Sequence, residues 1–372
     1  MTVTLLQERL KVRREEPFHA GPESPAVVGT FRTPAEQFFV RNHGTVPDVD
    51  LATFRLHVGG HVCRSFAFAL DDLRRRFPRH TVTATLQCAG NRRRELSAVR
   101  PIPGELDWGV KAIGNAEWTG VALQDLLVLA TPKRGAKHVG FTGLDVAAIG
   151  GVSTPFGASI PLQKALAPEV LLAYEMNGHP LPRAHGGPLR VVIPGYIGAR
   201  SVKWLARIDV LDAPSTNPFQ AQAYRLQTPG EDRGVFPGSE ALNECSVTSA
   251  ICDPAEGETV SAGRTTISGY AYAGGSPVER VEVRVDGKRS FSPARLLDPP
   301  APWVWTRWRC EVELAPGSRE IVARAFDADG NGQPEELASV WNPKGYGNTA
   351  WHRIRVEVLG RSQRFVAVPA NL

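Results

Sequence analysis

Cys88 is the residue whose neighbours most strongly suggest chemistry. It lies in the segment TVTATLQCAGNRRRELS (81–97), between an alternating apolar run and three consecutive arginines that follow a turn opened by Gly90. A lone cysteine at the end of a strand is most often a small buried apolar residue. Cations nearby, however, favour the thiolate form, which both a nucleophile and a ligand for a soft metal need. The arginines therefore make Cys88 a candidate functional thiol.

Two kinds of thiolate chemistry fit this segment. Cys88 and Arg94 match the C-x5-R spacing of loops that hold a phosphate around a cysteine nucleophile, but no histidine precedes Cys88 and Glu95 follows Arg94. The second chemistry is a metal site with one protein thiolate, in which oxo groups and a chelating cofactor take the other coordination positions. We favour the metal site, and a metal-independent cysteine phosphatase stays an alternative.

Composition and charge narrow the classes of partner. The 372 residues are enough for two domains, and 43 basic against 38 acidic residues give a net charge of +5. This excess is small and dispersed, so we expect small anions and not nucleic acid as partners. The 5 cysteines contain no C-x-x-C pair, which indicates neither a disulfide framework nor a zinc knuckle.

The N-terminal sequence bears on location. An Arg13-Arg14 pair is followed by Glu15 and Glu16, where an export signal would need an apolar run. No stretch of about 18 apolar residues is present to span a membrane. Together with the cysteine pattern, which suits a reducing compartment, this predicts a cytoplasmic protein without a membrane partner.

The elements that must position Cys88 belong to the first of two domains of different class. Up to about Leu211, amphipathic segments such as LDDLRRRF (70–77) and VALQDLLVLA (121–130) alternate with strand-like runs such as LRVVIP (189–194), which predicts an α+β domain. An irregular connector rich in Pro, Gly and Thr follows over 212–243, and its length suggests that it also lines a site.

The second domain is predicted to be an all-β immunoglobulin-like sandwich. Short alternating strands follow one another, among them VERVEVRV (278–285), which precedes an Asp286-Gly287 hairpin turn. The segment DADGNG (327–332) begins like a calcium loop, but Ala338 stands at its twelfth position, so we expect a β-turn. The expected boundaries are an N-terminal extension over 1–36, a catalytic domain with its linker over 37–240, the sandwich over 241–360 and a tail over 361–372.

Seven segments, in order from about Gln37, resemble the sulfite oxidase family of molybdenum enzymes. They are FFVRNHGTVP, LQCAGNRR, FTGLD, FGASIP, LLAYEMNG, HGGPLRVVIPGYIGARSVKWL and WNPKGYGNTAWHRIRV. The resemblance implies a molybdopterin-binding domain followed by an immunoglobulin-like dimerisation domain that forms a homodimer. It also implies a molybdenum-molybdopterin cofactor with Cys88 as the only protein ligand to the metal, and oxidation of sulfite to sulfate by oxygen-atom transfer. The 36 residues before Gln37 are fewer than the ~50 of a small domain, so we expect no fused haem domain and a separate electron acceptor.

The same resemblance assigns residues to the pterin and its phosphate. These are Phe39, Val40, Arg41, Asn42, His43, Asp145, His185, Arg190, Ser201, Val202 and Lys203. The residues themselves support part of this assignment. A strand, a glycine-containing turn and a basic end follow one another over 189–204, where free backbone N–H groups and Lys203 would meet a phosphate.

The resemblance also assigns a substrate site. Arg41 and Arg93 would bind the oxyanion, Trp108 and Tyr224 would line the site, and Lys344 would reach it from the second domain. In animal and plant sulfite oxidases a lysine stands at the position of Pro103 and an arginine at that of Lys344. Compared with those enzymes, the pocket has one positive charge fewer. At position 344 the ammonium of a lysine, a point charge, replaces an arginine guanidinium that can bind an oxyanion through two N–H groups.

Two alternatives to sulfite oxidation remain at this stage. The RNHG segment and the Trp108-Gly109 pair resemble eukaryotic nitrate reductases, whereas Tyr224 and the basic Lys344 resemble sulfite oxidases. A nitrate reductase-like or other oxo-transfer enzyme is therefore one alternative. The changes at Pro103 and Lys344 permit another, a cofactor-binding homologue without sulfite turnover.

Overall fold

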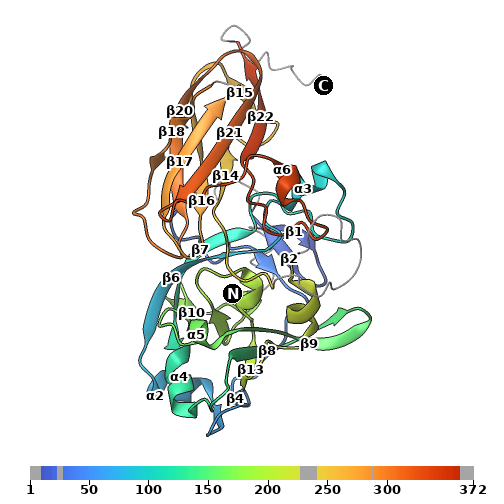
Figure 1. Cartoon of the computed structure of the whole chain (residues 1–372), viewed down its shortest axis with the longest axis vertical. Helices are drawn as coiled ribbons and strands as arrows, with labels where there is room; N and C mark the ends of the chain where they lie inside the picture. Colours follow the sequence, from blue (N-terminus) through green and yellow to red (C-terminus); the bar gives the residue numbers. More distant parts are fainter. Residues whose placement is uncertain (1–9, 23–27, 227–240, 287–288, 361–372) are drawn as a thin grey trace, which may run out of the picture.

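The structure, a computed structural model, describes residues 10–22, 28–226, 241–286 and 289–360, which form two domains (Figure 1). In this view the first domain is the lower one and the second is a β-sandwich above it, and β7 crosses the first domain just below the sandwich. The predicted order of an α+β domain followed by an all-β domain is confirmed.

Three sheets build the first domain. The first contains β1 (Lys11–Arg14), β2 (His19–Gly21) and β3 (Val40–Arg41). The second has the order β11 (His179–Pro180), β10 (Leu171–Met176), β7 (Ile113–Ala122) and β6 (His80–Gln87), with β12 (Arg190–Val192) also paired to β10. The third has the order β5 (Phe66–Phe68), β4 (Leu56–Gly60), β13 (Leu205–Leu211), β8 (His138–Ile149) and β9 (Val152–Pro161). Strands β4 and β13 are parallel, and the other neighbours in the three sheets are antiparallel.

Short helices connect these strands. They are α2 (Leu70–Arg76), α3 (Arg93–Val99), α4 (Leu123–Ala130), α5 (Leu162–Ala165), η2 (Arg183–His185), η3 (Gly198–Arg200) and η4 (Phe219–Ala223). The predicted amphipathic helix over 70–77 is α2, which buries Leu70 and Leu73. Helix α4 begins two residues later than the predicted segment, because Val121 and Ala122 continue β7 and pair with β10.

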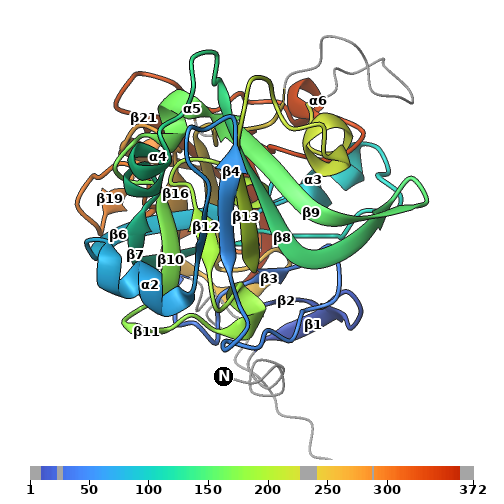
Figure 2. The same cartoon turned by 90° about the horizontal axis from the view of Figure 1, so that it is seen from below.

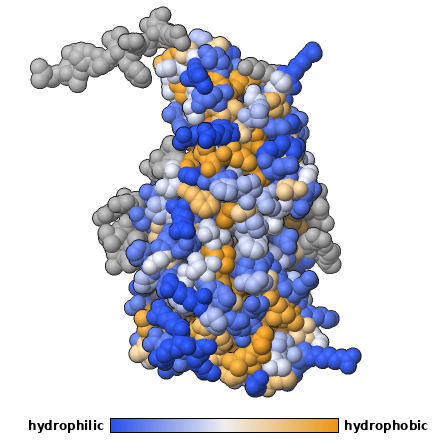
Figure 3. All heavy atoms as spheres, turned by 90° about the vertical axis from the view of Figure 1, so that its left-hand side faces the viewer, coloured by the Kyte–Doolittle hydropathy of each residue, from blue (hydrophilic) through white to orange (hydrophobic). Residues whose placement is uncertain are grey.

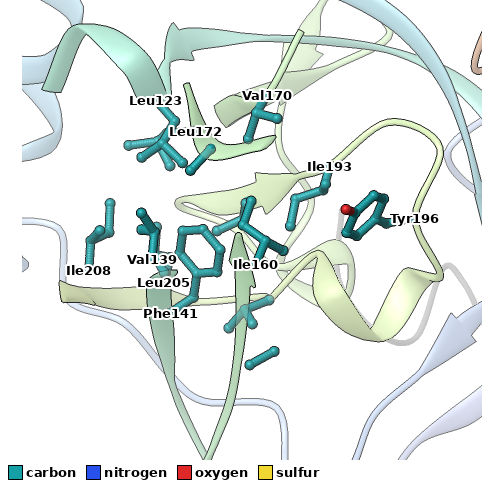
Figure 4. Packing of buried hydrophobic residues seen from close by; sticks show 14 of the residues in the cluster. Leu123, Val139, Phe141, Ile160, Val170, Leu172, Ile193, Tyr196, Leu205 and Ile208 are labelled. Carbon is teal, nitrogen blue, oxygen red and sulfur yellow. The ribbon is translucent and has the colours of Figure 1, made fainter. Parts of the chain in front are cut away.

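The main core lies between the second and third sheets. Figure 4 shows Leu123 and Leu172 facing Val139, Phe141 and Ile160 across this space, and all five side chains are buried. Each such side chain stabilises the fold by about 1.5 to 3 kcal/mol relative to an exposed one. Seen from below, β8 and β9 extend as a long hairpin away from α2 and α4 (Figure 2).

Two packed sheets form the second domain. One contains β14 (Thr248–Asp253), β16 (Gly263–Tyr272), β20 (Thr306–Leu314) and β19 (Arg295–Leu296), and the other β15 (Thr259–Ser261), β22 (His352–Leu359), β21 (Gly317–Asp327), β17 (Val278–Val285) and β18 (Ser292–Pro293). The short helix α6 (Leu337–Val340) follows β21. The alternating valines of β17 are buried as predicted, and Asp286 begins the turn with a φ of 45°, whereas Gly287 lies outside the described residues.

The DADGNG segment forms the predicted turn. One carboxylate oxygen of Asp327 accepts the backbone N–H groups of Asp329, at 3.1 Å, and of Asn331, at 2.8 Å. An aspartate that accepts nearby backbone N–H groups in this way is common in turns.

On the face shown in Figure 3, hydrophilic side chains cover much of the surface and apolar ones form patches on both domains. In the described part of the chain, no helix is both long and apolar enough to cross a membrane.

Candidate active site

Cys88 lies at the wall of a cavity in the first domain. It directly follows β6, its backbone N–H donates to the carbonyl of Ala112 at 2.8 Å, and its side chain is buried. The cavity has a volume of about 650 Å³, counting the space open to solvent. Its wall contains many of the predicted residues, namely Phe39, Arg41, Asn42, His43, Asp145, His185, Arg190, Ser201, Lys203 and Tyr224.

The other predicted residues lie beside this cavity. Val40 and Val202 are buried among apolar side chains behind its wall. Arg93, Trp108 and Lys344 lie near the turn that contains Cys88, and their contacts are described below. The predicted linker reaches the cavity through Tyr224, as its length suggested, whereas its part over 227–240 lies outside the described residues.

The turn that contains Cys88 is held by both domains. The backbone N–H of Gly347 donates to the carbonyl of Ala89 at 2.8 Å. The amide of Asn91 donates to the hydroxyl of Tyr270 at 2.8 Å and accepts the N–H of Ala112 at 3.0 Å. Because side chains and backbone of the second domain fix the turn, both domains set the position of the thiol.

The three consecutive arginines have three different environments. Arg92 is fully buried and pairs with Glu95 at 2.6 Å. Arg93 is also buried and donates to the carbonyl of Lys344 at 2.8 Å. Arg94 is 60% exposed and pairs with Asp107 at 2.7 Å. A phosphatase loop would need Arg94 beside the thiol, so this geometry disfavours the cysteine phosphatase.

Buried cations lie in another part of the cavity wall. The guanidinium of Arg190 donates to the carbonyls of His185 at 2.8 Å and Ser201 at 3.0 Å, and burial lowers its pKa to about 9. Lys203 donates to the side chain of Asn42, and burial also lowers its pKa. Carbonyl and amide oxygens do not neutralise a buried charge, and the nearby carboxylate of Asp145 offsets only one of the two cations, so an anion in the cavity is favoured.

Asp145 is the acid of this region. Burial raises its pKa to about 6, although Lys203 acts in the opposite direction. One of its carboxylate oxygens is buried and has no hydrogen-bond partner among the described residues. It sits in β8 at the point where the pairing with β9 is irregular, between Thr142 and Val146. An unsatisfied buried carboxylate is suited to receive N–H donors from a bound heterocycle.

Neutral histidines complete the wall. Burial lowers the pKa of His185 to about 3, and its Nε2 lies 2.8 Å from the carbonyl of Ala35, which fixes the proton on that nitrogen because a carbonyl only accepts. His43 is stacked on Phe156, with ring centroids 4.4 Å apart, and burial likewise lowers its pKa. Its Nε2 lies 2.8 Å from the hydroxyl of Tyr224.

His19 contacts two residues of the cavity wall, Arg41 and Asn42, and the sequence did not reveal this role. It lies in β2, which pairs with β3, so that His19 faces Arg41 across the two strands. Its Nε2 is 2.8 Å from the carbonyl of Asn42, and its buried Nδ1 has no partner among the described residues. Burial, followed by the charge of Arg41, lowers its pKa to about 3. The pairing of β2 with β3 is a tertiary contact, so no local spacing announces it.

These residues fit a metal-pterin cofactor with a phosphate group. A single thiol is available for a metal, the cations of Arg190 and Lys203 suit a phosphate, and unsatisfied polar atoms on Asn42 and Asp145 are available for a heterocycle. The fit rests on the chemistry of these side chains, because buried charges and polar groups in native proteins normally have partners.

Comparison with known proteins points to the same kind of cofactor. Residues 43–219 match the oxidoreductase molybdopterin binding domain, and residues 239–359 match the Mo-co oxidoreductase dimerisation domain. The chain is 45% identical over 357 residues to sulfite oxidase of Gallus gallus, covering 92% of this chain and 77% of that protein. The chain belongs to the sulfite oxidase family. Its cofactor is accordingly molybdenum-molybdopterin.

Further relatives support the family and the fold. Sulfite oxidase of Arabidopsis thaliana is 40% identical, and the match covers 95% of each chain. An inducible NADH nitrate reductase of Glycine max is 36% identical over 94% of this chain but only 42% of its own. The crystal structure of the sulfane dehydrogenase SoxCD from Paracoccus pantotrophus superposes with a TM-score of 0.80 at 25% identity, covering 96% of this chain and 90% of that one.

In this member of the sulfite oxidase family, an aromatic stack leads from the cavity to the predicted substrate residues. The ring of Tyr224 stacks on Tyr346 with centroids 5.2 Å apart, and the guanidinium of Arg93 lies 5.2 Å from the centroid of Tyr346. Burial raises the pKa of Tyr224 to about 12, so its hydroxyl stays protonated. Trp108 is fully buried against Phe39, and its indole N–H has no partner among the described residues.

Proposed function

We propose that this chain oxidises sulfite to sulfate at a molybdenum centre bound by Cys88 and passes two electrons to a separate acceptor. The proposal rests on the cations near Tyr224. Arg41 lines the same cavity as Tyr224, and the guanidinium of Arg93 lies over Tyr346, whose ring stacks on that of Tyr224. A doubly charged oxyanion is the ligand that such a group of cations favours. The sulfite oxidases among the relatives support the same substrate.

Each protein group has a part in binding. When bound, the molybdenum-pterin centre supplies the oxygen atom and accepts the two electrons. Arg41 and Arg93 hold the oxyanion; at an effective dielectric of about 20, a unit charge about 4 Å away contributes on the order of 4 kcal/mol before desolvation. Tyr224, which stays protonated, donates a hydrogen bond, and neutral His43 holds its hydroxyl in place.

Other residues would hold the cofactor. Arg190 and Lys203 would bind the phosphate, while Asp145 and Asn42 would bind polar edges of the pterin. His185, with its proton fixed on Nε2, would offer Nδ1 as an acceptor. For Asp145 and Asn42 the roles are supported by one buried polar atom on each side chain that has no hydrogen-bond partner among the described residues.

An assay of both activities tests this proposal. Purified, molybdenum-loaded enzyme is assayed for sulfite oxidation with a dye acceptor and for nitrate reduction with an artificial donor. We expect sulfite turnover to exceed nitrate turnover, because Tyr224 and Lys344 match the sulfite-oxidising pattern. Faster nitrate turnover would contradict the proposal, and no turnover of either would favour a cofactor-binding homologue.

Two single cysteine variants test the role of Cys88. Cys88→Ser should abolish sulfite turnover and lower the molybdenum content, whereas Cys63→Ser, which alters an exposed free cysteine, should leave both unchanged. Equal activity of the Cys88→Ser variant and the wild type would remove the thiol from the mechanism.

We also propose that the second domain joins two chains in a homodimer. The match of residues 239–359 to a dimerisation domain supports this, and closed two-fold dimers are the commonest homo-oligomers. The cytoplasmic location expected from the sequence stays a prediction, which cell fractionation would test.

A further inference from the structure

A carboxylate lies between two of the cations assigned to the oxyanion. Glu105 precedes Trp108 in the loop between α3 and β7. One of its oxygens is 3.5 Å from Nη2 of Arg93, and the other is 3.2 Å from Nζ of Lys344. Glu105 and Arg93 come from the first domain and Lys344 from the second, so the three residues form an ion-pair cluster across the domain boundary.

The cluster borders the site of Cys88. The guanidinium of Arg93 packs so closely over Gly90 that a Cβ at this glycine would lie 2.5 Å from it. The same guanidinium lies over Tyr346, which stacks on Tyr224 in the cavity wall. An anion that reaches Arg93 from the cavity therefore meets a cation that already has a carboxylate partner.

The three members of the cluster differ in exposure. The side chain of Arg93 is 4% exposed, that of Glu105 18% and that of Lys344 43%. Water and salt screen a buried pair much less than an exposed one. The charge of Glu105 therefore acts mainly on Arg93, and its contact with Lys344 is the weaker and more easily exchanged one.

We propose that Glu105 is an internal counter-anion that competes with substrate and product oxyanions for Arg93 and Lys344, and so sets the affinity of the site. The inference rests on the proposed oxyanion site. With Glu105 present, Arg41, Arg93 and Lys344 carry a combined charge of about +2 rather than +3. A dianion is then still bound, but the product is less strongly retained.

A purely structural role of Glu105 predicts the opposite result. If the carboxylate only orients Arg93, its replacement loosens the guanidinium and weakens oxyanion binding. If it competes with the oxyanion, its replacement by the isosteric neutral glutamine strengthens binding. The direction of the change in KM therefore separates the two roles.

The experiment compares Glu105→Gln with two controls in full-length, molybdenum-loaded enzyme. Glu105→Asp keeps the charge and should stay close to the wild type. Asp107→Asn removes an equal charge two residues away, from a carboxylate that pairs with exposed Arg94. We expect Glu105→Gln to lower both KM for sulfite and the inhibition constant of sulfate about tenfold at low salt, and Asp107→Asn to change either less than about twofold.

A binding measurement keeps the test independent of turnover. Inorganic sulfate is titrated calorimetrically into each oxidised enzyme, and Glu105→Gln should bind it about tenfold more tightly than the wild type. If sulfite is not turned over but this difference is found, the proposed activity fails and the role of Glu105 stands. Unchanged or weaker sulfate binding by Glu105→Gln, or equal strengthening by Asp107→Asn, would overturn the inference.

Discussion

The buried pair of Arg92 and Glu95 offers the sharpest test of how the Cys88 turn is held. Arg92 is completely buried and forms two hydrogen bonds to Glu95, at 2.9 and 2.6 Å, and a third to Thr248 of the second domain at 3.0 Å. Its carbonyl accepts the side-chain amide of Asn348, also of the second domain, at 3.0 Å. The pair thus joins the two domains four residues from the thiol.

Replacing Arg92 with methionine leaves a carboxylate whose side chain is only 18% exposed without its main partner. Burial alone would raise the pKa of Glu95, but its interactions, with the charge of Arg92 the largest of them, outweigh burial and lower the pKa in the folded protein. Removing one member of such a pair costs about 3 to 5 kcal/mol. Arg92 has a φ of 65°, a left-handed conformation that is as unfavourable for methionine as for arginine. The substitution therefore leaves the backbone strain unchanged, and the difference in stability reports the lost side-chain contacts.

A double-mutant cycle measures the pair itself. Arg92→Met, Glu95→Leu and the double variant are unfolded in urea and followed by tryptophan fluorescence, with molybdenum content measured alongside. We expect Arg92→Met to cost about 3 to 5 kcal/mol and to lower metal retention, and the double variant to recover about 2 kcal/mol or more of the summed losses. Additive losses, or an Arg92→Met variant as stable as the wild type, would refute this reasoning.

Three further predictions concern the oxyanion, acid stability and assembly. Arg41→Gln should lower kcat/KM for sulfite by the equivalent of about 2 to 5 kcal/mol, measured against Arg94→Gln, which removes an exposed arginine; equal effects of the two changes would place the substrate elsewhere. Burial lowers the pKa of His352 from 6.5 to about 4, so the unfolded chain takes up this proton first. Stability should therefore be lost as the pH falls from 6.5 towards 4, and His352→Gln should show a shallower loss in urea titrations across this window. Sedimentation should show a dimer at micromolar concentration, and a monomer at all concentrations would remove the homodimer.

Periodic segments were the most predictable part of the fold. The spacing of Leu70 and Leu73 located α2, and the alternating valines located β17, because one buried face imposes its period on the sequence. The start of α4 was less predictable. Val121 and Ala122 are apolar in either element, and pairing with β10, a tertiary contact, places them in β7.

The candidate site was predictable only where a motif carried it. Cys88 stood out through its own neighbours, and the resemblance supplied much of the cavity wall. His19 and Glu105 were missed, because a strand pairing and an ion pair across the domain boundary bring them to the site. Neither contact leaves a local pattern in the sequence.

The three consecutive arginines show that residue type alone does not determine the role of a residue. Arg92 has a left-handed backbone conformation, with a φ of 65°, directly before α3 begins at Arg93. This conformation turns the chain, so that adjacent identical side chains point to the domain boundary, the candidate oxyanion site and the solvent. The roles of such residues are decided by the backbone turn and by partners far away in the sequence.

The second domain helps to position the residues of the candidate active site. Tyr270, Gly347 and Asn348 bond directly to the turn that follows Cys88. A thiolate ligand must be held in a fixed place if a metal centre is to present its reactive groups to a substrate in one orientation. In this chain the first domain alone does not fix that turn, because several of its hydrogen bonds end on the second domain. The position of the thiol therefore depends on the domain boundary, including the hydrogen bonds of Arg92 with Thr248 and Asn348.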